Sequence, residues 1–348
     1  MKNKSFASDN NTPVHPKIMQ AIMNANREDF ISYGDDPYTK QAEEQLRRVF
    51  GPDAHPFLVF TGTAANVLGL ASILRSYHAV IAPVTSHINV DECGALENIT
   101  GSKLLTVPTS VGKLTPGHVR TFLHSLGVEH HAQPRVISIT QPTELGTVYS
   151  PAEIRELADF AHDNGLYLHM DGARLANAAA FLHTSLRAIT AEAGVDILSF
   201  GGTKNGMMFG ESVIFFNRET ASSFKYLRKQ GMQLGAKMRY LAAQFIAYLS
   251  DDLWLKNAGK ANAMARILAE QAAELPGVEI LQPVETNGVF LRLPKKAIPL
   301  LQDKSFFYVW NEEAGEVRWM TSFETSREDI DSFIALARTV LREIKEDH

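Results

Sequence analysis

Cysteine is almost absent from this chain: Cys93 is the only one among 348 residues. A single cysteine excludes any disulfide within the chain and any cysteine-rich metal site. We therefore expect a reducing compartment, the cytoplasm, and no metal centre. Residues 1–16 also lack the apolar core of a secretion signal. No apolar run is long enough to cross a membrane, because Arg75 and His78 interrupt the most apolar early window, residues 67–84.

The chain also lacks an excess of positive charge and a dinucleotide-binding motif. Its formal net charge of -5 disfavours binding to nucleic acid. The loop after the first predicted strand reads TGTAAN (Thr61 to Asn66) instead of G-x-G-x-x-G, which disfavours a nucleotide-binding dehydrogenase. The remaining composition, 45% hydrophobic and 21% charged, predicts a globular protein with a sizeable core.

Apolar and helical segments alternate from Phe57 to Phe216, which predicts a mostly parallel sheet with helices on both faces. Its strands are predicted at 57–61, 80–83, 103–107, 136–141, 166–171, 197–200 and 212–216, and helices at 16–26, 38–50, 62–77, 116–126 and 150–164. A helical region, Arg218 to Leu275, follows, with breaks expected at Gly231, Gly235 and Gly259. Strands at 278–281, 289–293 and 317–320 and a helix at 327–346 then predict a small α+β domain. We therefore divide the chain into a large domain, residues 1–250, and a linker helix with the small domain, residues 251–348.

Two segments that follow neighbouring predicted strands carry the strongest chemical signal. LSFGGTKNG (198–206) presents Lys204 on a glycine-rich turn, and LYLHMDGAR (166–174) ends an apolar run with Asp171 and Arg174. The carboxyl ends of parallel strands share one edge of a sheet, where α/β proteins bind ligands. An amine and a carboxylate at that edge suit pyridoxal 5'-phosphate (PLP). The lysine forms a Schiff base with the cofactor aldehyde, and the carboxylate keeps the pyridine nitrogen protonated.

Two more loops fit a PLP site. Gly62 and Thr63 open a helix directly after a strand, so that free backbone N–H groups and the helix dipole favour a phosphate. An ordinary helix cap is the alternative. His87 follows the next strand, where its imidazole would lie on the pyridine ring and move protons near neutral pH. A solvated or core histidine is the alternative reading of His87.

Taken in order, these motifs resemble those of the threonine aldolase family. They are SDN (8–10), YGDDP (33–37), TGTAAN (61–66), SHI (86–88), DGARL (171–175) and GGTKNG (201–206). The resemblance implies a fold-type-I PLP enzyme, with a mostly parallel seven-stranded sheet sandwiched by helices and a small C-terminal α+β domain. It also implies retro-aldol cleavage of L-threonine, L-allo-threonine or a bulkier β-hydroxy-α-amino acid to glycine and an aldehyde. A β-eliminating lyase or an aminotransferase would use the same lysine and aspartate and remains the alternative.

The resemblance also implies roles for individual residues. The predicted catalytic residues are Lys204 as the Schiff-base lysine, Asp171 as the partner of the pyridine nitrogen and His87 as the stacked ring. The predicted cofactor-binding residues are Gly62, Thr63, His87, Asp171, Arg174, Thr203, Lys204, Lys237 and Arg239, and the predicted substrate-binding residues are Ser8, Tyr33, Arg174 and Arg318. Lys237 and Arg239 lie in GAKMRY, which is similar to a segment that reaches the phosphate of a neighbouring subunit. That similarity implies a dimer, with a tetramer of two dimers as the family's usual assembly; a solvated helix face is an equally good reading.

One motif departs from the family. Where many members have Glu-Asn-Thr-His, this chain has Gln141-Pro142-Thr143-Glu144, so the histidine that could accept the proton of the substrate hydroxyl is absent. Glu144, or His87 with a water molecule, is expected to take that role. This substitution and the GGTKNG form are similar to the phenylserine aldolase branch, which favours bulkier substrates.

Overall fold

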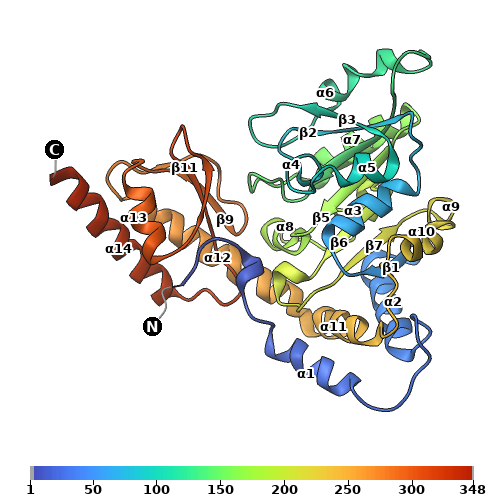
Figure 1. Ribbon diagram of the computed structural model, residues 1–348, viewed down its shortest axis with the longest axis horizontal. Helices are drawn as coiled ribbons and strands as arrows, with labels where there is room; N and C mark the ends of the chain where they lie inside the picture. The colour runs from blue at the N-terminus through green and yellow to red at the C-terminus, as the bar shows by residue number, and fades with distance from the viewer. Residues whose placement is uncertain (1–3, 347–348) are drawn as a thin grey trace.

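Two β-sheets organise the protein, whose computed structural model describes residues 4–346 (Figure 1). The larger sheet has seven strands in the order β1-β7-β6-β5-β4-β2-β3. They are β1 (His55–Val59), β2 (His78–Pro83), β3 (Lys103–Val107), β4 (Gln133–Thr140), β5 (Tyr167–Gly172), β6 (Ile197–Gly201) and β7 (Glu211–Phe215). Only β7 runs antiparallel to its neighbours, β1 and β6. The predicted mostly parallel seven-stranded sheet is confirmed.

Helices cover both faces of this sheet. The helices are α1 (Pro16–Ala25), α2 (Pro37–Phe50), α3 (Gly62–Ala71), α4 (His87–Val90), α5 (Ala95–Thr100), α6 (Pro116–Arg120), α7 (Pro151–Asp163), α8 (Leu175–Leu182), α9 (Arg218–Ala221), α10 (Phe224–Gln230) and α11 (Arg239–Leu249). On one face, α3, α4, α5 and α10 pack on alternate residues of the strands, such as Ile197 and Val213. On the other face, α2, α7, α8 and α11 bury the intervening residues, such as Leu198 and Ile214. Successive side chains of a strand point to opposite faces of the sheet, so every second residue of each strand lies on the face that α3 covers.

Local sequence signals explain where several helices begin. Ser150 and Glu153 form the predicted capping box of α7, in which each side chain bonds to the backbone of the other residue. Asp36 caps α2 by accepting a hydrogen bond from the backbone of Thr39. The Thr61 hydroxyl accepts from the Ala64 N–H at the start of α3, immediately after β1. These caps fix the residue at which each helix begins and the direction in which it leaves the preceding segment.

The structure corrects four details of the predicted elements. The helix that opens at Gly62 ends at Ala71, where the Ser72 hydroxyl bonds to the Gly69 carbonyl, and it does not continue to residue 77. The helix predicted at 116–126 splits into α6 and a 3₁₀ turn, η2 (Leu123–Ser125). Gly259 does not break a helix: α12 (Leu253–Ala273) runs through it, and a Cβ there would meet open space. Strand β4 starts at Gln133, three residues before the strand predicted at 136–141.

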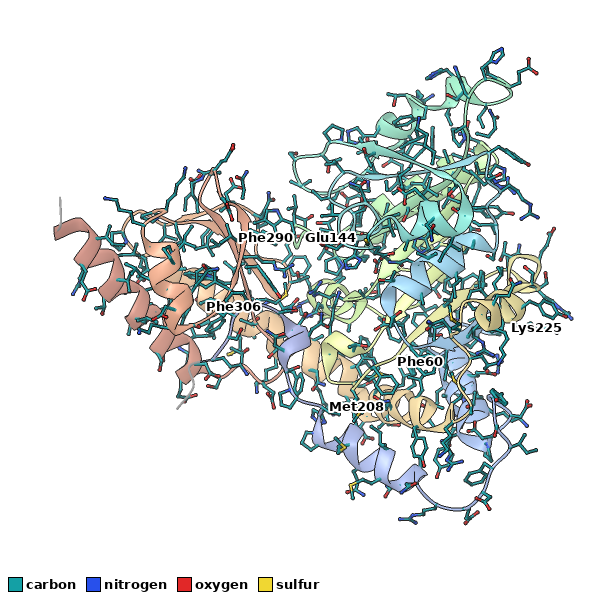
Figure 2. The ribbon with its side chains drawn as sticks, in the orientation of Figure 1. Phe60, Glu144, Met208, Lys225, Phe290 and Phe306 are labelled. Carbon is teal, nitrogen blue, oxygen red and sulfur yellow. The ribbon has the colours of Figure 1, made fainter. Side chains whose placement is uncertain are left out.

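The C-terminal part builds a second, antiparallel sheet in the order β10-β11-β9-β8. Its elements are β8 (Glu279–Ile280), β9 (Gly288–Arg292), α13 (Ala297–Lys304), β10 (Tyr308–Asn311), β11 (Glu316–Met320) and α14 (Arg327–Glu346), of which α13 and β10 had no predicted counterpart. Val289 and Trp319 on one face of this sheet are buried against α12, α13 and α14. The other face carries Phe290, which is labelled in Figure 2, and its ring would lie 3.6 Å from a Cβ on Gly146 of the larger unit. The predicted small α+β unit is thus present.

The N-terminal segment crosses to the small sheet before it joins the large one. Phe6 donates its N–H to the Phe306 carbonyl, accepts from the Met320 N–H and packs in the core of the small unit. The turn η5 (Ser250–Asp252) separates α11 from α12, and Asp251 and Asp252 have φ values of 52° and 54°. The chain therefore bends close to residue 250, although the division into residues 1–250 and 251–348 stays a prediction. Across residues 4–346, no helix combines the length and apolar character needed to span a bilayer.

Candidate functional site

A cavity lies at the carboxyl-end edge of the large sheet, beneath α3. Its walls are formed by Gly62, Asn66, His87, Thr140, Pro142, Glu144, Asp171, Ala173, Arg174, Ser199, Lys204 and Glu211. Five predicted site residues, Gly62, His87, Asp171, Arg174 and Lys204, therefore line one cavity. They come from different parts of the sequence because the parallel strands end at the same edge.

Lys204 lies on a 3₁₀ turn, η4 (Thr203–Asn205), directly after β6. Two glycines allow this tight turn: a Cβ at Gly202 would meet the Met207 sulfur at 2.1 Å, and Gly206 has a φ of 111°. Among residues 4–346, the Lys204 amine has no hydrogen-bond or ion-pair partner. An unpartnered amine in a cavity is available to react with a carbonyl group.

Asp171 is the second-last residue of β5 and is almost fully buried. Its Oδ2 accepts a hydrogen bond from Asn66 Nδ2 at 2.8 Å, and its Oδ1 accepts from the Ala173 N–H at 3.0 Å. Burial alone would raise the pKa of Asp171, but the charges of His87 and Lys204 and the hydrogen bond from Asn66 hold it below its usual value. The carboxylate therefore stays ionised, as a partner of a protonated pyridine nitrogen must.

His87 opens α4 and is held by a buried acid. Its Nδ1 lies 2.8 Å from Oε1 of Glu92, and the same oxygen accepts from Asn66 Nδ2 at 2.8 Å. The hydrogen bond to Glu92 is the main reason that the pKa of His87 is raised, despite the opposing effect of burial. Asn66 therefore links Glu92, which orients His87, to Asp171.

The start of α3 has the features predicted for an anion site. The backbone N–H groups of Gly62 and Thr63 have no partner within the described part of the chain, and a Cβ at Gly62 would meet no atom within 4 Å. Unpaired N–H groups at a helix start, next to open space, fit a phosphate group. Thr203 is differently engaged: its hydroxyl donates to Glu211 Oε1 at 2.7 Å and accepts from the Gly210 N–H at 3.0 Å.

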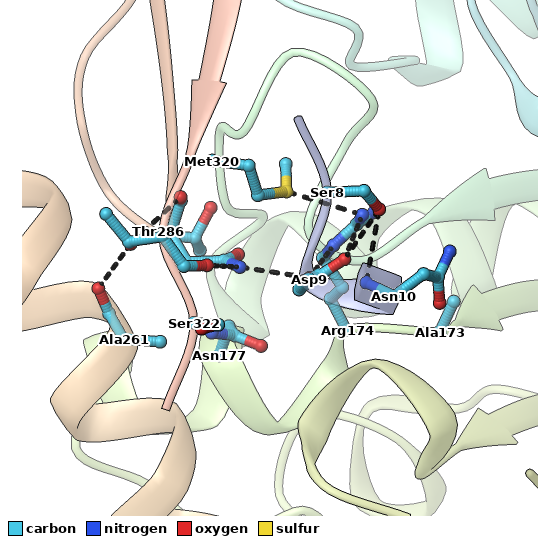
Figure 3. Close-up of polar contacts among 12 residues, drawn as sticks. Ser8, Asp9, Asn10, Ala173, Arg174, Asn177, Ala261, Thr286, Met320 and Ser322 are labelled. Carbon is cyan, nitrogen blue, oxygen red and sulfur yellow. Dashed lines mark hydrogen bonds and ion pairs between the residues drawn. The ribbon is translucent and has the colours of Figure 1, made fainter. Parts of the chain in front are cut away.

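Arg174 is tied to the N-terminal segment by Asp9 (Figure 3). The guanidinium donates from Nε and Nη2 to the two carboxylate oxygens of Asp9, at 2.7 and 2.9 Å. Burial lowers the pKa of Arg174, but the charge and hydrogen bonds of Asp9 outweigh that effect and raise it. Ser8 lies next to this pair, where its hydroxyl accepts from the Asn10 N–H. The structure thus brings Ser8 and Arg174 together, and no residue among 4–346 pairs with Nη1 of Arg174.

Arg318 lies on the face of β11 that points away from the small core. Its cross-strand neighbours on that face are Phe290 and Tyr308, and Met320, two residues along, touches Nη2 of Arg174 through its sulfur. The guanidinium carbon is 5.9 Å from the centre of the Tyr308 ring and 5.4 Å from that of Trp310. Buried Nε has no partner, and burial together with the charge of Arg174 lowers the pKa of Arg318. A carboxylate bound here would supply the missing anion.

Seven predicted site residues do not line this cavity: Ser8, Tyr33, Thr63, Thr203, Lys237, Arg239 and Arg318. Tyr33, Lys237 and Arg239 form a group of their own. Tyr33 has a φ of 63°, bonds its N–H to the Ala236 carbonyl and carries Lys229 over its ring. Lys237 follows Ala236 directly, and Arg239 stacks on Tyr240. These three residues therefore form a patch together with the segment 229–240.

Two further acids line the cavity. Glu144 follows β4, and burial together with the charge of Asp171 raises its pKa. Glu211 is the first residue of β7 and has 6% exposure; burial raises its pKa to about 7. Glu144 was a predicted candidate, whereas Glu211 was not.

Four functional candidates escaped the sequence reasoning: Asp9, Asn66, Glu92 and Glu211. Asn66 carries a usable signal, because it lies four residues after Gly62 and hence on the same face of α3. The antiparallel direction of β7 brings its first residue, Glu211, to the edge where β5 and β6 end. The sequence carried no direct signal for the partners of Asp9 and Glu92.

Known proteins match this chain along almost its whole length. The family model described as beta-eliminating lyase matches residues 5–296. A low specificity L-threonine aldolase from Pseudomonas aeruginosa is 47% identical over 97% of both chains. One from a Pseudomonas species is 42% identical over 98% of this chain and 99% of the relative. The solved structure of Leishmania major threonine aldolase superposes with a TM-score of 0.91, at 30% identity, over 97% of this chain and 99% of the other. The family expected from the motifs is confirmed: the chain belongs to the beta-eliminating lyase family, among the threonine aldolases.

Proposed function

We propose that this protein is a PLP-dependent aldehyde-lyase that cleaves L-threonine, L-allo-threonine or a bulkier β-hydroxy-α-amino acid to glycine and an aldehyde. One observation carries the proposal. The unpartnered amine of Lys204 and the ionised carboxylate of Asp171 line the same cavity as the free helix start at Gly62. An amine for the aldehyde, an acid for the pyridine nitrogen and N–H donors for the phosphate are the groups that PLP requires. The residues present therefore fit this cofactor.

When bound, PLP supplies an electron sink for the electron pair released when a bond at the substrate Cα breaks. The protein decides which bond breaks by orienting the substrate. Within the part of the chain that the structure describes, Nε of Arg318 has no partner, and Asp9 binds Nε and Nη2 of Arg174 but not its Nη1. Together they would bind the substrate carboxylate with charge-assisted hydrogen bonds and fix rotation about the substrate N–Cα bond. Ser8, beside Asp9, is a further candidate for this carboxylate.

Retro-aldol cleavage also requires a group that removes the proton of the β-hydroxyl. Glu144 is our first candidate because it lines the cavity and its raised pKa brings a carboxylate closer to the range of an effective base. His87 is the second candidate, since Glu92 occupies its Nδ1 and leaves Nε2 for the cavity.

Product analysis tests the proposal. The purified protein, supplied with PLP, is incubated with L-threonine, L-allo-threonine and phenylserine, and glycine, aldehyde, keto acid and ammonia are measured. Equimolar glycine and aldehyde are expected, and their ratio across the three substrates reports the preferred side chain. Release of keto acid and ammonia without glycine would contradict the proposal and favour a β-eliminating lyase, while amino transfer to a keto acid would favour an aminotransferase.

We also propose an oligomeric state and a cellular compartment for the protein. The patch around Tyr33, Lys237 and Arg239 lies outside the cavity of its own chain, which supports a homodimer, or a tetramer of dimers, with shared sites. Sedimentation of a mixture of Lys204→Ala and Lys237→Ala chains, with an assay for restored activity, tests this sharing. The cytoplasm remains the expected compartment on the ground of the single cysteine.

A further inference from the structure

Glu211 is a buried acid in the candidate site that the mechanism above does not use. It pairs with Gly201 across the β6–β7 ladder and lies on the same face of the sheet as Asp171. That face is covered by α3, and both Glu211 and Gly62 line the cavity. Glu211 therefore lines the same small cavity as Gly62, the first residue of the helix whose N–H groups are open to an anion.

The local backbone is shaped to hold this carboxyl group. A Cβ on Gly201 would come within 2.3 Å of Glu211 Oε2, so the first glycine of GGTKNG leaves room for the acid. The hydroxyl of Thr203 donates to Oε1 at 2.7 Å. Any larger residue at position 201 would displace the carboxyl group of Glu211. The observed position of this carboxyl group therefore requires glycine at position 201.

No cation within residues 4–346 forms an ion pair with Glu211. The charges of Lys204 on η4 and Asp171 on β5 act on Glu211, and the charge of Glu211 acts in turn on Tyr248 of α11, the helix on the opposite face of the sheet. The positive charge of Lys204 favours the ionised form of Glu211, whereas the charge of Asp171 disfavours it. On its other side β1 presents Val59, which is apolar. Burial is the largest influence on the pKa of Glu211 and raises it to about 7.

We propose that Glu211 is a proton-dependent positioning residue for the phosphate group of the cofactor. With a proton, its carboxyl group donates a hydrogen bond toward the anion bound by the N–H groups of Gly62 and Thr63. Without the proton, its charge opposes that anion. Binding of a phosphate-bearing cofactor is therefore accompanied by proton uptake at Glu211 near neutral pH. This inference rests on the proposed function, because it takes the anion at α3 to be the PLP phosphate.

The test measures binding instead of activity. Pyridoxamine 5'-phosphate is the probe, because it has no aldehyde to bond with Lys204. Its affinity is measured by titration calorimetry from about pH 6 to about pH 8.5, on either side of the raised pKa. Glu211→Gln keeps the size and a hydrogen-bond donor but cannot ionise. Relative to this variant, we expect the affinity of the unchanged protein to fall about tenfold over that range, since one pKa unit of coupling is a tenfold change.

Calorimetry in buffers of different ionisation enthalpy gives a second readout. At about pH 7.5 we expect the unchanged protein to take up more protons on binding than Glu211→Gln does, because the buried acid has a pKa of about 7. Thr203→Val removes the hydrogen bond that lowers the pKa of Glu211, so it should move the midpoint of the pH dependence upward. Glu44→Gln, on the exposed side of α2, is the matched control and should behave like the unchanged protein. Pyridoxamine, which lacks the phosphate, should show no difference between the two proteins.

The outcomes separate this inference from the proposed function. Equal pH profiles and equal proton uptake for the unchanged protein and Glu211→Gln would overturn the role of Glu211 and leave the PLP site intact. An equal loss of affinity at every pH in Glu211→Gln would also overturn it, because the carboxylate would then be needed in its charged form. If pyridoxamine 5'-phosphate binds neither protein at any pH, the proposed function itself fails.

Discussion

Arg174 and Asp9 form a bidentate ion pair, with Nε and Nη2 donating to Oδ2 and Oδ1 at 2.7 and 2.9 Å (Figure 3). Asn287, which precedes β9, donates to the same Oδ2 at 3.0 Å. Asp9 thus joins the N-terminal segment, the large sheet and the small sheet at one point beside the cavity. Because Nε and Nη2 of Arg174 donate to Asp9, they are not available for a bidentate contact with a substrate, and Nη1 is the nitrogen left to donate to one.

Asp9→Ala should destabilise the protein by about 3–5 kcal/mol, because it leaves the buried Arg174 without its counter-charge. Arg174 and the other hydrogen bonds keep the pKa of Asp9 low although burial raises it. The contribution of Asp9 is therefore present above its unfolded-state pKa and is lost as the pH falls through its lower folded-state value. Urea unfolding at pH 7 measures the change. Asn10→Ala, on the exposed neighbouring residue, is the control, and equal stability of the two variants would contradict the role of Asp9.

Arg318→Ala should weaken the binding of substrate and of glycine, because Arg318 has an unpaired Nε on the face that looks toward Arg174. Loss of a buried charged partner corresponds to about 2–5 kcal/mol in kcat/KM. The measurement is steady-state kinetics together with glycine binding. Arg292→Ala is the control. Arg292 lies on the adjacent strand but its guanidinium pairs with Glu279 and Glu316, so the kinetics of this variant should match those of the unchanged protein. An unchanged specificity constant in Arg318→Ala would remove this residue from the site.

Glu144→Gln should lower kcat by about 10²–10⁴-fold if Glu144 takes the hydroxyl proton. A base works only when deprotonated, and burial and Asp171 raise the pKa of Glu144. Activity of the unchanged protein should therefore rise with pH through that raised value, and the variant should lack this acidic limb. The pH profile of kcat/KM for L-threonine is the measurement. Glu156→Gln on α7 is the control, and a retained limb in Glu144→Gln would transfer the role to His87.

The sequence was sufficient to predict most of the large sheet and the centre of the site. Lys204, Asp171 and His87 each follow an apolar segment, and the shared edge of parallel strands places them together. Glu211 could not be found by that rule, because it begins its strand and β7 runs antiparallel to its neighbours. Asp9 was equally hidden, since its partner Arg174 is distant in sequence and nothing local indicates their contact.

Local sequence patterns were also insufficient for parts of the small unit and for the ends of helices. β10 was missed because its residues are mostly exposed and lack a clear apolar alternation. The low helix propensity of glycine predicts a break at Gly259, but the neighbouring Ala258 and Ala261 are buried, so tertiary packing keeps α12 continuous. Sequence patterns thus indicated which elements form, whereas their ends depended on contacts formed only in the folded chain.

Lys204 is proposed to form the Schiff base with PLP, and the visible absorption spectrum reports this covalent link. After incubation with PLP and removal of the excess, the unchanged protein should show the band of a lysine-bound cofactor, and borohydride should fix the cofactor to Lys204 in a peptide map. Addition of glycine before reduction should produce a band at longer wavelength, while Lys204→Ala should show no borohydride-stable attachment. A reconstituted protein without any such band, or with the cofactor fixed to another lysine, would contradict the account.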